Sequence, residues 1–403
     1  MKKTVFLAGA MIWAVIALMI LVFFVGMLTK AWSPSFFKGG LTMFGENTKL
    51  VKEETFPIEG IHELSLGTYA HTINITWVEG NEMTVRQYDI NSDVLFAADR
   101  QEGQLNINIP QRKVIMTFGV NIDPRLEVSL PRSYADTLAL KTSSGTVRIE
   151  EGITCSALSI QTSSGSVRLG AVNADSVNIS SNSGTQRLDN IRAAGWVSLH
   201  STSGSIHCAE IDASGCNINT NSGTLRVEDI KVRENISLES TSGSIHAENL
   251  HGQGVFLKSN SGTISCSALM ASGDASVSSS SGSQNIGSVD AVSFHIGSNS
   301  GTLRYGNIVG TGSMASSSGS IHCGALDVKG NVSITSSSGT QRITLAADQS
   351  LELQVNTSSG SIRADGFGLS YTNDRGNSAS ATLGNGEGSL RLKSSSGSVH
   401  LSY

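Results

Sequence analysis

The sequence predicts an all-β protein in which a right-handed parallel β-helix, or β-solenoid, follows one N-terminal transmembrane helix. Three observations predict this class. A Ser-Gly-Ser/Thr phrase recurs along the chain, apolar residues occupy every second position on both sides of the phrase, and the only prolines lie at 34, 57, 110, 124 and 131. Proline is avoided where nearly every backbone N–H is needed for hydrogen bonds between strands.

The chain divides into four predicted regions. Residues 1–29 form a transmembrane anchor, and residues 30–55 form a tether with Gly, Pro and charges but no periodicity. Residues 56–134 contain alternating stretches such as "HTINITWVEG" with irregular connections, and they are expected to cap the solenoid. Residues 135–403 form the repeat β-solenoid.

The anchor is predicted from an apolar run, Thr4 to Leu28, of 25 residues without a charge. At about 1.5 Å per residue such a helix crosses a hydrocarbon core of about 30 Å. The run is longer than that of a cleaved signal peptide, so we expect an uncleaved anchor. Lys2 and Lys3 favour a cytoplasmic N-terminus, although Lys30 and Lys38 weaken that preference. The rest of the chain is then expected outside the cytoplasm.

The repeat is measured by the glycine of its phrase. This glycine falls at 145, 165, 184, 204, 223, 243, 262, 282, 301, 319, 339, 360 and 397, in steps of 18 to 21 residues and one final double step. Apolar residues stand five and usually seven before it, and mostly two and four after it. A unit of strand, turn and strand cannot bury its apolar face alone, so the units must stack. About 13 rungs of ~20 residues, spaced by ~4.8 Å, are expected.

The phrase itself is expected to serve the architecture. Its glycine supplies a turn geometry that a side chain would obstruct. The Ser and Thr hydroxyls can bond to backbone groups at the corner or to their counterparts in neighbouring rungs.

The residue three after the glycine indicates the length of one coil. Copies with Gly-Thr have Arg187, Arg226, Arg304 and Arg342 there, and copies with Gly-Ser have His207, His246, His322 and His400. Like charges directly opposed on neighbouring strands repel, so the alternation favours one coil per ~20 residues. A coil of about 39 residues with two corners is the alternative, and it would align arginine above arginine.

The His-Cys dipeptides at 207–208 and 322–323 are the candidates for a metal site. Four cysteines occupy slots that are apolar in other copies: Cys208, Cys216, Cys266 and Cys323. Neighbouring residues of a strand point to opposite faces, and cysteine is a suitable small core residue. We therefore expect a buried core role, with neither zinc nor a disulfide framework.

No catalytic, cofactor-binding or metal-ligating residue is predicted, and no cofactor. Outward pairs occur two residues apart, at Arg148/Glu150, Arg187/Asp189, Arg226/Glu228 and His246/Glu248. Carboxylates on such a face could serve as acid and base, but these pairs recur with the repeat, as a solvated charge ladder does. We expect a protein that is not an enzyme. The net charge of −5 and pI near 6.0 also argue against nucleic acid as a partner.

The N-terminal anchor, the stretch closing in "RLEVSLP", the phrase "LALKTSSGTVRIE" and the terminal "GEGSLRLKSSSGSVHLSY" together resemble a bacterial family of unknown function. That family is labelled "putative adhesin" and has β-strand repeats. The resemblance covers about Phe56 to Tyr403 and implies a role at the cell surface or envelope, with no catalytic residue to carry over.

The predicted function is a structural or adhesin-like β-solenoid, anchored in the bacterial membrane by a single pass, with most of the chain extracytoplasmic. It would bind or scaffold at the cell envelope. A protein or a polysaccharide of the envelope is the expected partner, besides the membrane itself and a second copy of the chain. The alternatives are a carbohydrate-active β-helix enzyme and an accessory protein of envelope-stress signalling.

The ends of the stack need protection, since an end coil exposes unpaired N–H and C=O groups. Residues 56–134 are expected to cover the N-terminal end. Near the C-terminus one copy of the phrase has decayed into "GFGLSYTNDRGNSASATLGNGEG" at 366–388. This segment is expected to fold over the C-terminal edge.

Overall fold

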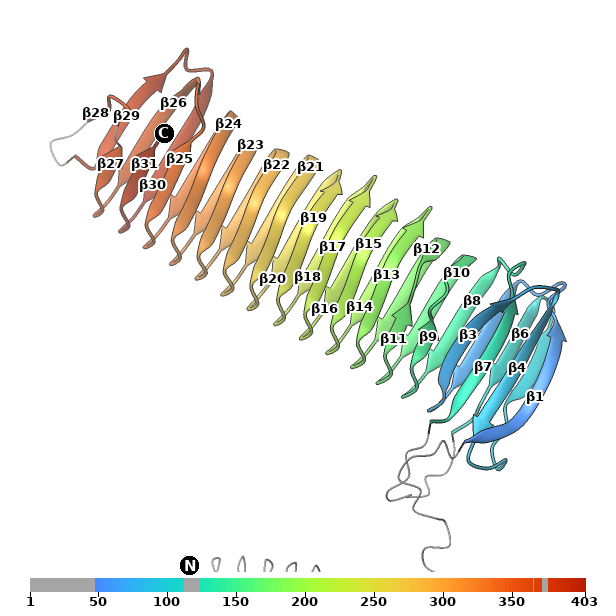
Figure 1. The fold of residues 1–403 in the computed structure, drawn as a ribbon. Coiled ribbons are helices and arrows are strands. Elements are labelled where there is room, and N and C mark those ends of the chain that lie inside the picture. The colour runs from blue at the N-terminus through green and yellow to red at the C-terminus, as the bar shows by residue number, and fades with distance from the viewer. Residues whose placement is uncertain (1–47, 112–122, 365, 372–375) are drawn as a thin grey trace, which may run out of the picture. The chain divides into compact units, whose positions relative to one another are not determined.

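The computed structural model describes residues 48–111, 123–364, 366–371 and 376–403. Over these residues the chain forms 31 strands and no helix, joined by hydrogen bonds into one sheet that winds into stacked coils (Figure 1). The predicted all-β solenoid is confirmed. The predicted anchor, 1–29, lies outside the described residues, and within them no helix has the length and apolar character to span a membrane. The predicted tether, 30–55, is described only from residue 48, and the first strand begins within it at Lys49.

Seven strands precede the regular repeat: β1 (Lys49–Pro57), β2 (Glu63–Thr68), β3 (Thr72–Val78), β4 (Glu82–Asp89), β5 (Ala97–Gln101), β6 (Gln104–Asn108) and β7 (Arg125–Pro131). β2 pairs in parallel with β6 and with β8 (Thr137–Thr142), and β3 pairs in parallel with β7 and with β9 (Val147–Ile149). The coil of β2 and β3 therefore lies between the coil of β8 and β9 and the coil of β6 and β7, although β2 and β3 come first in the chain. The antiparallel strands β5, β4 and β1 continue the sheet beyond that outer coil.

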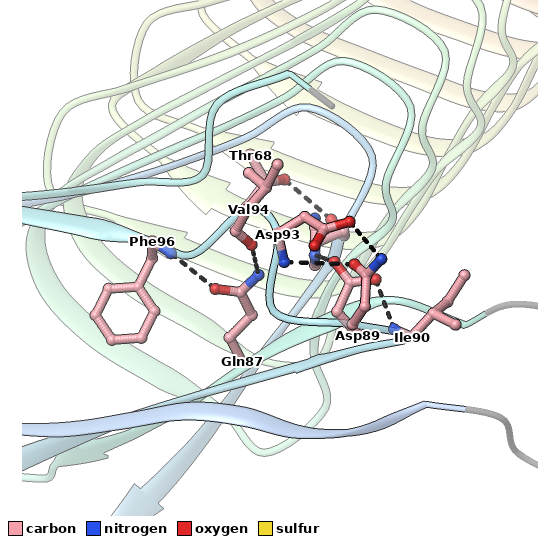
Figure 2. Close-up of polar contacts among 9 residues, drawn as sticks. Thr68, Gln87, Asp89, Ile90, Asp93, Val94 and Phe96 are labelled. Atoms are coloured by element: carbon pink, nitrogen blue, oxygen red, sulfur yellow. Dashed lines mark hydrogen bonds and ion pairs between the residues drawn. The ribbon is translucent and has the colours of Figure 1, made fainter. Parts of the chain in front are cut away.

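A buried polar network holds the connection from β4 to β5 at this end (Figure 2). Gln87 is fully buried, and its Nε2 donates to the carbonyl oxygen of Val94 at 2.8 Å while its Oε1 accepts from the N–H of Phe96 at 2.7 Å. Asp89 Oδ2 lies 3.1 Å from Nε2 of the buried His71. These bonds join the connection to strand ends, which is a structural role.

The regular stack contains seventeen strands: β8 (Thr137–Thr142), β9 (Val147–Ile149), β10 (Ile153–Thr162), β11 (Val167–Leu169), β12 (Val172–Ser181), β13 (Gln186–Ala193), β14 (Trp196–Ser201), β15 (Ile206–Ala213), β16 (Gly215–Thr220), β17 (Leu225–Val232), β18 (Asn235–Ser240), β19 (Ile245–Gly252), β20 (Gly254–Ser259), β21 (Ile264–Ser279), β22 (Gln284–Ser298), β23 (Leu303–Ser316) and β24 (Ile321–Ser336). Strands of successive coils are parallel and in register. The inward row five before the glycine shows this register.

That row runs through Leu140, Ile160, Ile179, Leu199, Ile218, Leu238, Leu257, Val277, Ile296, Met314 and Ile334, eleven residues joined by ten steps. About ten turns thus follow one another in sequence order, and the prediction of about 13 such rungs was too high. The difference arises because coils at the two ends do not stack in the order in which they occur in the chain.

One coil shows how the sequence pattern becomes structure. In β18 the side chains of Ile236, Leu238 and Ser240 are buried, and the residues between them face outward. After the Ser-Gly corner, β19 buries every second residue until Glu248 and Asn249, which are both exposed. Alternation shifts by one residue at this point, so the strand turns to a new face of the coil and then continues inward and outward as before.

The coil length of about 20 residues is confirmed, and the 39-residue alternative is wrong. Arg187 pairs with His207, and His207 pairs with Arg226. Arginine therefore lies two coils from arginine in this part of the row. The first coils differ, because Arg148, Arg168 and Arg187 pair in direct succession.

Seven strands form the C-terminal end: β25 (Gln341–Leu345), β26 (Leu351–Thr357), β27 (Ile362–Ala364), β28 (Ser370–Tyr371), β29 (Ser378–Leu383), β30 (Gly388–Ser394) and β31 (Val399–Ser402). Ile334 pairs with Leu392 of β30, and Leu392 pairs on its other side with Val355 of β26. The last coil of the sequence, β30 and β31, thus lies in the stack between the coil of β24 and β25 and the coil of β26 and β27. β29 pairs antiparallel with β26, and β28 pairs with β29, so the described part of 366–388 covers the edge as predicted.

The interior is filled mainly by aliphatic side chains, with cysteine and a few aromatic residues such as Phe294 and Tyr305. All five cysteines are buried and free, which confirms the core role predicted for Cys208, Cys216, Cys266 and Cys323. Burial raises the pKa of the Cys216 thiol to about 12, so it is a thiol rather than a thiolate. The right-handed sense of the coil stays a prediction.

Candidate functional site

The glycine of each corner is required by the close approach of the preceding coil. A Cβ added to Gly184 would lie 1.7 Å from the carbonyl oxygen of Gly165, and one added to Gly165 would lie 1.7 Å from that of Gly145. None of these three glycines has a positive φ. Space between coils, rather than a left-handed backbone, therefore excludes a side chain here.

The first hydroxyl of each phrase faces inward and joins neighbouring corners. Ser201 Oγ accepts the N–H of Gly204 at 2.9 Å, and Ser181 Oγ donates to Ser201 Oγ at 3.1 Å. Thr220 Oγ1 in turn donates to the carbonyl oxygen of Gly204 at 3.4 Å. The buried hydroxyls thus form a ladder along the inside of the corner, and the predicted architectural role of the phrase is confirmed.

Three buried glutamines, which the sequence analysis missed, reinforce this ladder. Gln284 Nε2 donates to Ser279 Oγ at 3.1 Å and to the carbonyl oxygen of Gly297 at 2.7 Å. The hydroxyl of Tyr305 donates to Gln284 Oε1, and burial raises the pKa of Tyr305 well above its ordinary value. Gln186 and Gln341 make the same kind of bonds through Nε2. The sequence did contain a signal for these residues, because glutamine stands two after the glycine, at a position that is apolar in other copies.

Outside this ladder, a cavity of about 570 Å³ lies on the outer surface of the coils, where β20 to β24 and β30 run into their Ser-Gly corners. We call it the polar groove. Its lining repeats in three adjacent rows over successive coils, at the positions four, three and two before each glycine. The row at four before consists of Lys258, Ser278, Gly297, Ala315, Thr335 and Lys393, in which each residue pairs in register with the next. The row at two before is Ser, with Asn260 and Asn299. The row at three before consists of serines of the inward ladder, which are mostly buried and bonded within it.

The depth of the groove follows from side-chain size. The middle of its first row carries the smallest side chains, whereas lysine stands at each end. A Cβ added to Gly297 would meet no atom within 4 Å, so the space above this residue is open. The groove is therefore a trough bounded by two ammonium groups and lined by hydroxyl and amide groups.

A second, smaller cavity extends the same face. It has a volume of about 250 Å³, is lined mainly by Asn, Ser and Thr, and shares Lys258 and Asn260 with the polar groove. Two exposed aromatic side chains stand on this outer face, Trp196 at 44% and Phe256 at 38% exposure. Phe256 precedes Lys258 by two residues on β20, so both side chains project from the same side of the strand.

The structure does not bring the His-Cys dipeptides or the outward charged pairs together into a metal or catalytic site. His207 and Cys208 face opposite sides, the histidine half-buried and the cysteine in the core. Arg148 and Glu150 form an outward ion pair at 3.6 Å. Over the described residues no three His, Cys, Asp or Glu side chains gather in a way that could hold a metal ion. Hydrogen bonding to a ligand is the chemistry that the groove offers.

Comparison with known proteins bears on the fold. The sequence matches the family described as "Toastrack DUF4097" over residues 61–249 and again over 245–402. A solved structure titled a "putative cell adhesion protein", from Clostridium sporogenes ATCC 15579, is 12% identical over 87% of this chain and 98% of its own, with a TM-score of 0.18. A "putative adhesin" from Bacteroides fragilis NCTC 9343 is 15% identical over 64% and 97%, with a TM-score of 0.29.

No curated protein matches the chain. The two family matches together reach from residue 61 to residue 402 and so cover nearly all of the stacked coils. The chain belongs to the Toastrack DUF4097 family.

Proposed function

We propose that this chain is a β-solenoid of the bacterial cell envelope that binds or scaffolds a polysaccharide in the polar groove. The segment at 1–29 anchors it in the membrane, and the solenoid lies outside the cytoplasm. The groove is the observation that supports this proposal: rows of hydroxyl, amide and ammonium groups repeat from coil to coil. A saccharide polymer presents hydroxyl groups at regular intervals, so both partners have a repeating pattern of hydrogen-bonding groups.

The aromatic side chain beside the groove supports the same class of ligand. Phe256 is partly exposed and stands on the outer face next to Lys258. A flat apolar ring among polar groups can pack against the C–H face of a sugar while the neighbouring side chains bond to its hydroxyls.

Binding rather than turnover fits the composition of the groove. Its lining consists of Ser, Thr, Asn, Lys, Gly and Ala. Hydrolysis of a glycosidic bond ordinarily uses a pair of carboxyl groups, and this lining has none. A carbohydrate-active enzyme is therefore the less favoured function.

The ligand class is tested with the full-length chain in detergent and immobilised polysaccharides, neutral dextran and acidic polygalacturonate. We expect at least one of the two polymers to be retained. Phe256→Ala and Gly297→Leu should each weaken that binding about fivefold, because one removes an exposed ring and the other fills open space in the groove. Met270→Ala, which removes another exposed apolar side chain away from the groove lining, is the matched control. Binding unaffected by both groove variants, or shortening of the polymer, would overturn the proposal.

The location is tested separately by thiol labelling in intact cells. Asn385 is exposed, whereas the native cysteines are buried, so Asn385→Cys provides one accessible thiol. We expect a membrane-impermeant reagent to label it in intact cells. Labelling that appears only after lysis would place the solenoid in the cytoplasm.

A further inference from the structure

We infer that the polymer bound in the polar groove is an acidic polysaccharide, one that carries carboxylate groups along its length. This inference rests on the proposed function and names the class of its ligand. The groove contains Lys258 and Lys393 and no Asp, Glu or His among its lining residues. The whole chain has a net charge of −5, so a lining with two cations and no anion departs from the average surface.

The two ammonium groups are available to a ligand. Neither Lys258 nor Lys393 forms an ion pair with a described residue. Glu239 pairs in register with Lys258 on the side away from the polar groove, and both residues line the smaller cavity, but these two described residues form no ion pair. Carboxylates of a ligand would supply the counter-charges within the groove itself.

The separation of the two lysines indicates an extended ligand. Five register steps lead from Lys258 to Lys393, which at ~4.8 Å per step is a distance of ~24 Å along the stack. A small anion can contact only one of them, and a single exposed ion pair contributes little. A chain with repeated carboxylates can contact both at once and gains from the linkage.

The hydroxyl and amide rows between the lysines distinguish a polysaccharide from other polyanions. Ser278 and Thr335 belong to the row four before the glycine, and Asn299 belongs to the row two before it. These neutral groups donate to and accept from hydroxyl groups. A polysaccharide acid offers both carboxylates and hydroxyls, whereas inorganic polyphosphate offers only anionic oxygens.

The test measures the affinity of the full-length chain for polygalacturonate, for its fully methyl-esterified form and for inorganic polyphosphate. We expect the wild-type chain to prefer polygalacturonate to both, with binding that weakens as salt increases. The double variant Lys258→Gln/Lys393→Gln should bind polygalacturonate about five- to tenfold more weakly. Lys141→Gln is the matched control, because Lys141 is exposed in the same row of the stack but outside the groove.

Equal affinity of the double variant and the wild type for polygalacturonate would overturn the inference, as would a preference for polyphosphate. If the methyl-esterified polymer binds as tightly as the acid, and Gly297→Leu weakens the binding of both, the proposed function stands and the acidic class is wrong. If neither polysaccharide binds, the proposed function and this inference are both wrong.

Discussion

Gly243 shows at the level of one residue why the repeated phrase contains glycine. A Cβ at this position would lie 1.8 Å from the carbonyl oxygen of Gly223 and 3.0 Å from Ser240 Oγ. Gly243→Ala must therefore push two coils apart, and we expect it to lower the free energy of unfolding by at least about 2 kcal/mol. The measurement is denaturant unfolding followed by circular dichroism.

Gly297→Ala is the control for that experiment. An added methyl group meets no atom within 4 Å, and φ is not positive, so the change should be neutral or stabilising by about 0.4–1 kcal/mol. Similar losses for Gly243→Ala and Gly297→Ala would show that contact between coils is not the reason for the corner glycine.

The alternation of histidine and arginine should make the stability of the fold depend on pH. Burial, and then the neighbouring Arg187 and Arg226, lower the pKa of His207, and burial with Arg342 and Arg304 lowers that of His322. The unfolded chain has an ordinary histidine pKa near ~6.5 and so binds these protons first as the pH falls. The free energy of unfolding is therefore unaffected by these histidines above about pH 6.5, and it decreases as the pH falls below that value.

We therefore expect the melting temperature of the wild type to fall more between about pH 8 and about pH 5 than that of His207→Gln/His322→Gln. The comparison requires thermal scans of both proteins at several pH values. An identical pH dependence of the two proteins would show that folding does not lower the pKa values of these two histidines.

At the scale of the strand, β16 tests the assignment of inward and outward residues. Ile218 is completely buried between Leu199 and Leu238, whereas Asn219 faces outward and contacts His200. Ile218→Asp buries an unpaired carboxylate and should cost several kcal/mol, above about 3. Asn219→Asp should change stability by less than about 1 kcal/mol. Equal melting temperatures would contradict the register of the stack.

The strands and their inward rows could be predicted because they depend on local alternation. Leu238 is inward for the same reason that Leu140 is, namely its place five before a glycine. The bond between Tyr305 and Gln284 could not be predicted, since tyrosine there occupies a slot that is apolar in other copies. Contacts between side chains of different coils depend on shape, which the period alone does not encode.

At the scale of the whole stack, the order of the end coils escaped prediction for a physical reason. Val355 and Leu392 occupy the same inward position of their coils, so either could lie against Ile334 by its apolar character alone. The structure places Leu392 there and Val355 beyond it. This exchange brings Lys393 next to Thr335 and thereby forms the second end of the polar groove.

Each Ser-Gly phrase marks one coil of the stack. The positions of the corner, of the rows and of the polar groove all depend on this correspondence. The row four before the glycine leads from Lys141 to Lys258 in six register steps. Spin labels attached to Lys141→Cys and Lys258→Cys should report, by double electron–electron resonance, a separation centred near ~29 Å, at ~4.8 Å per step. The buried native cysteines leave the two introduced thiols as the accessible sites. A separation near ~14 Å, the value for coils of twice the length, would contradict the account.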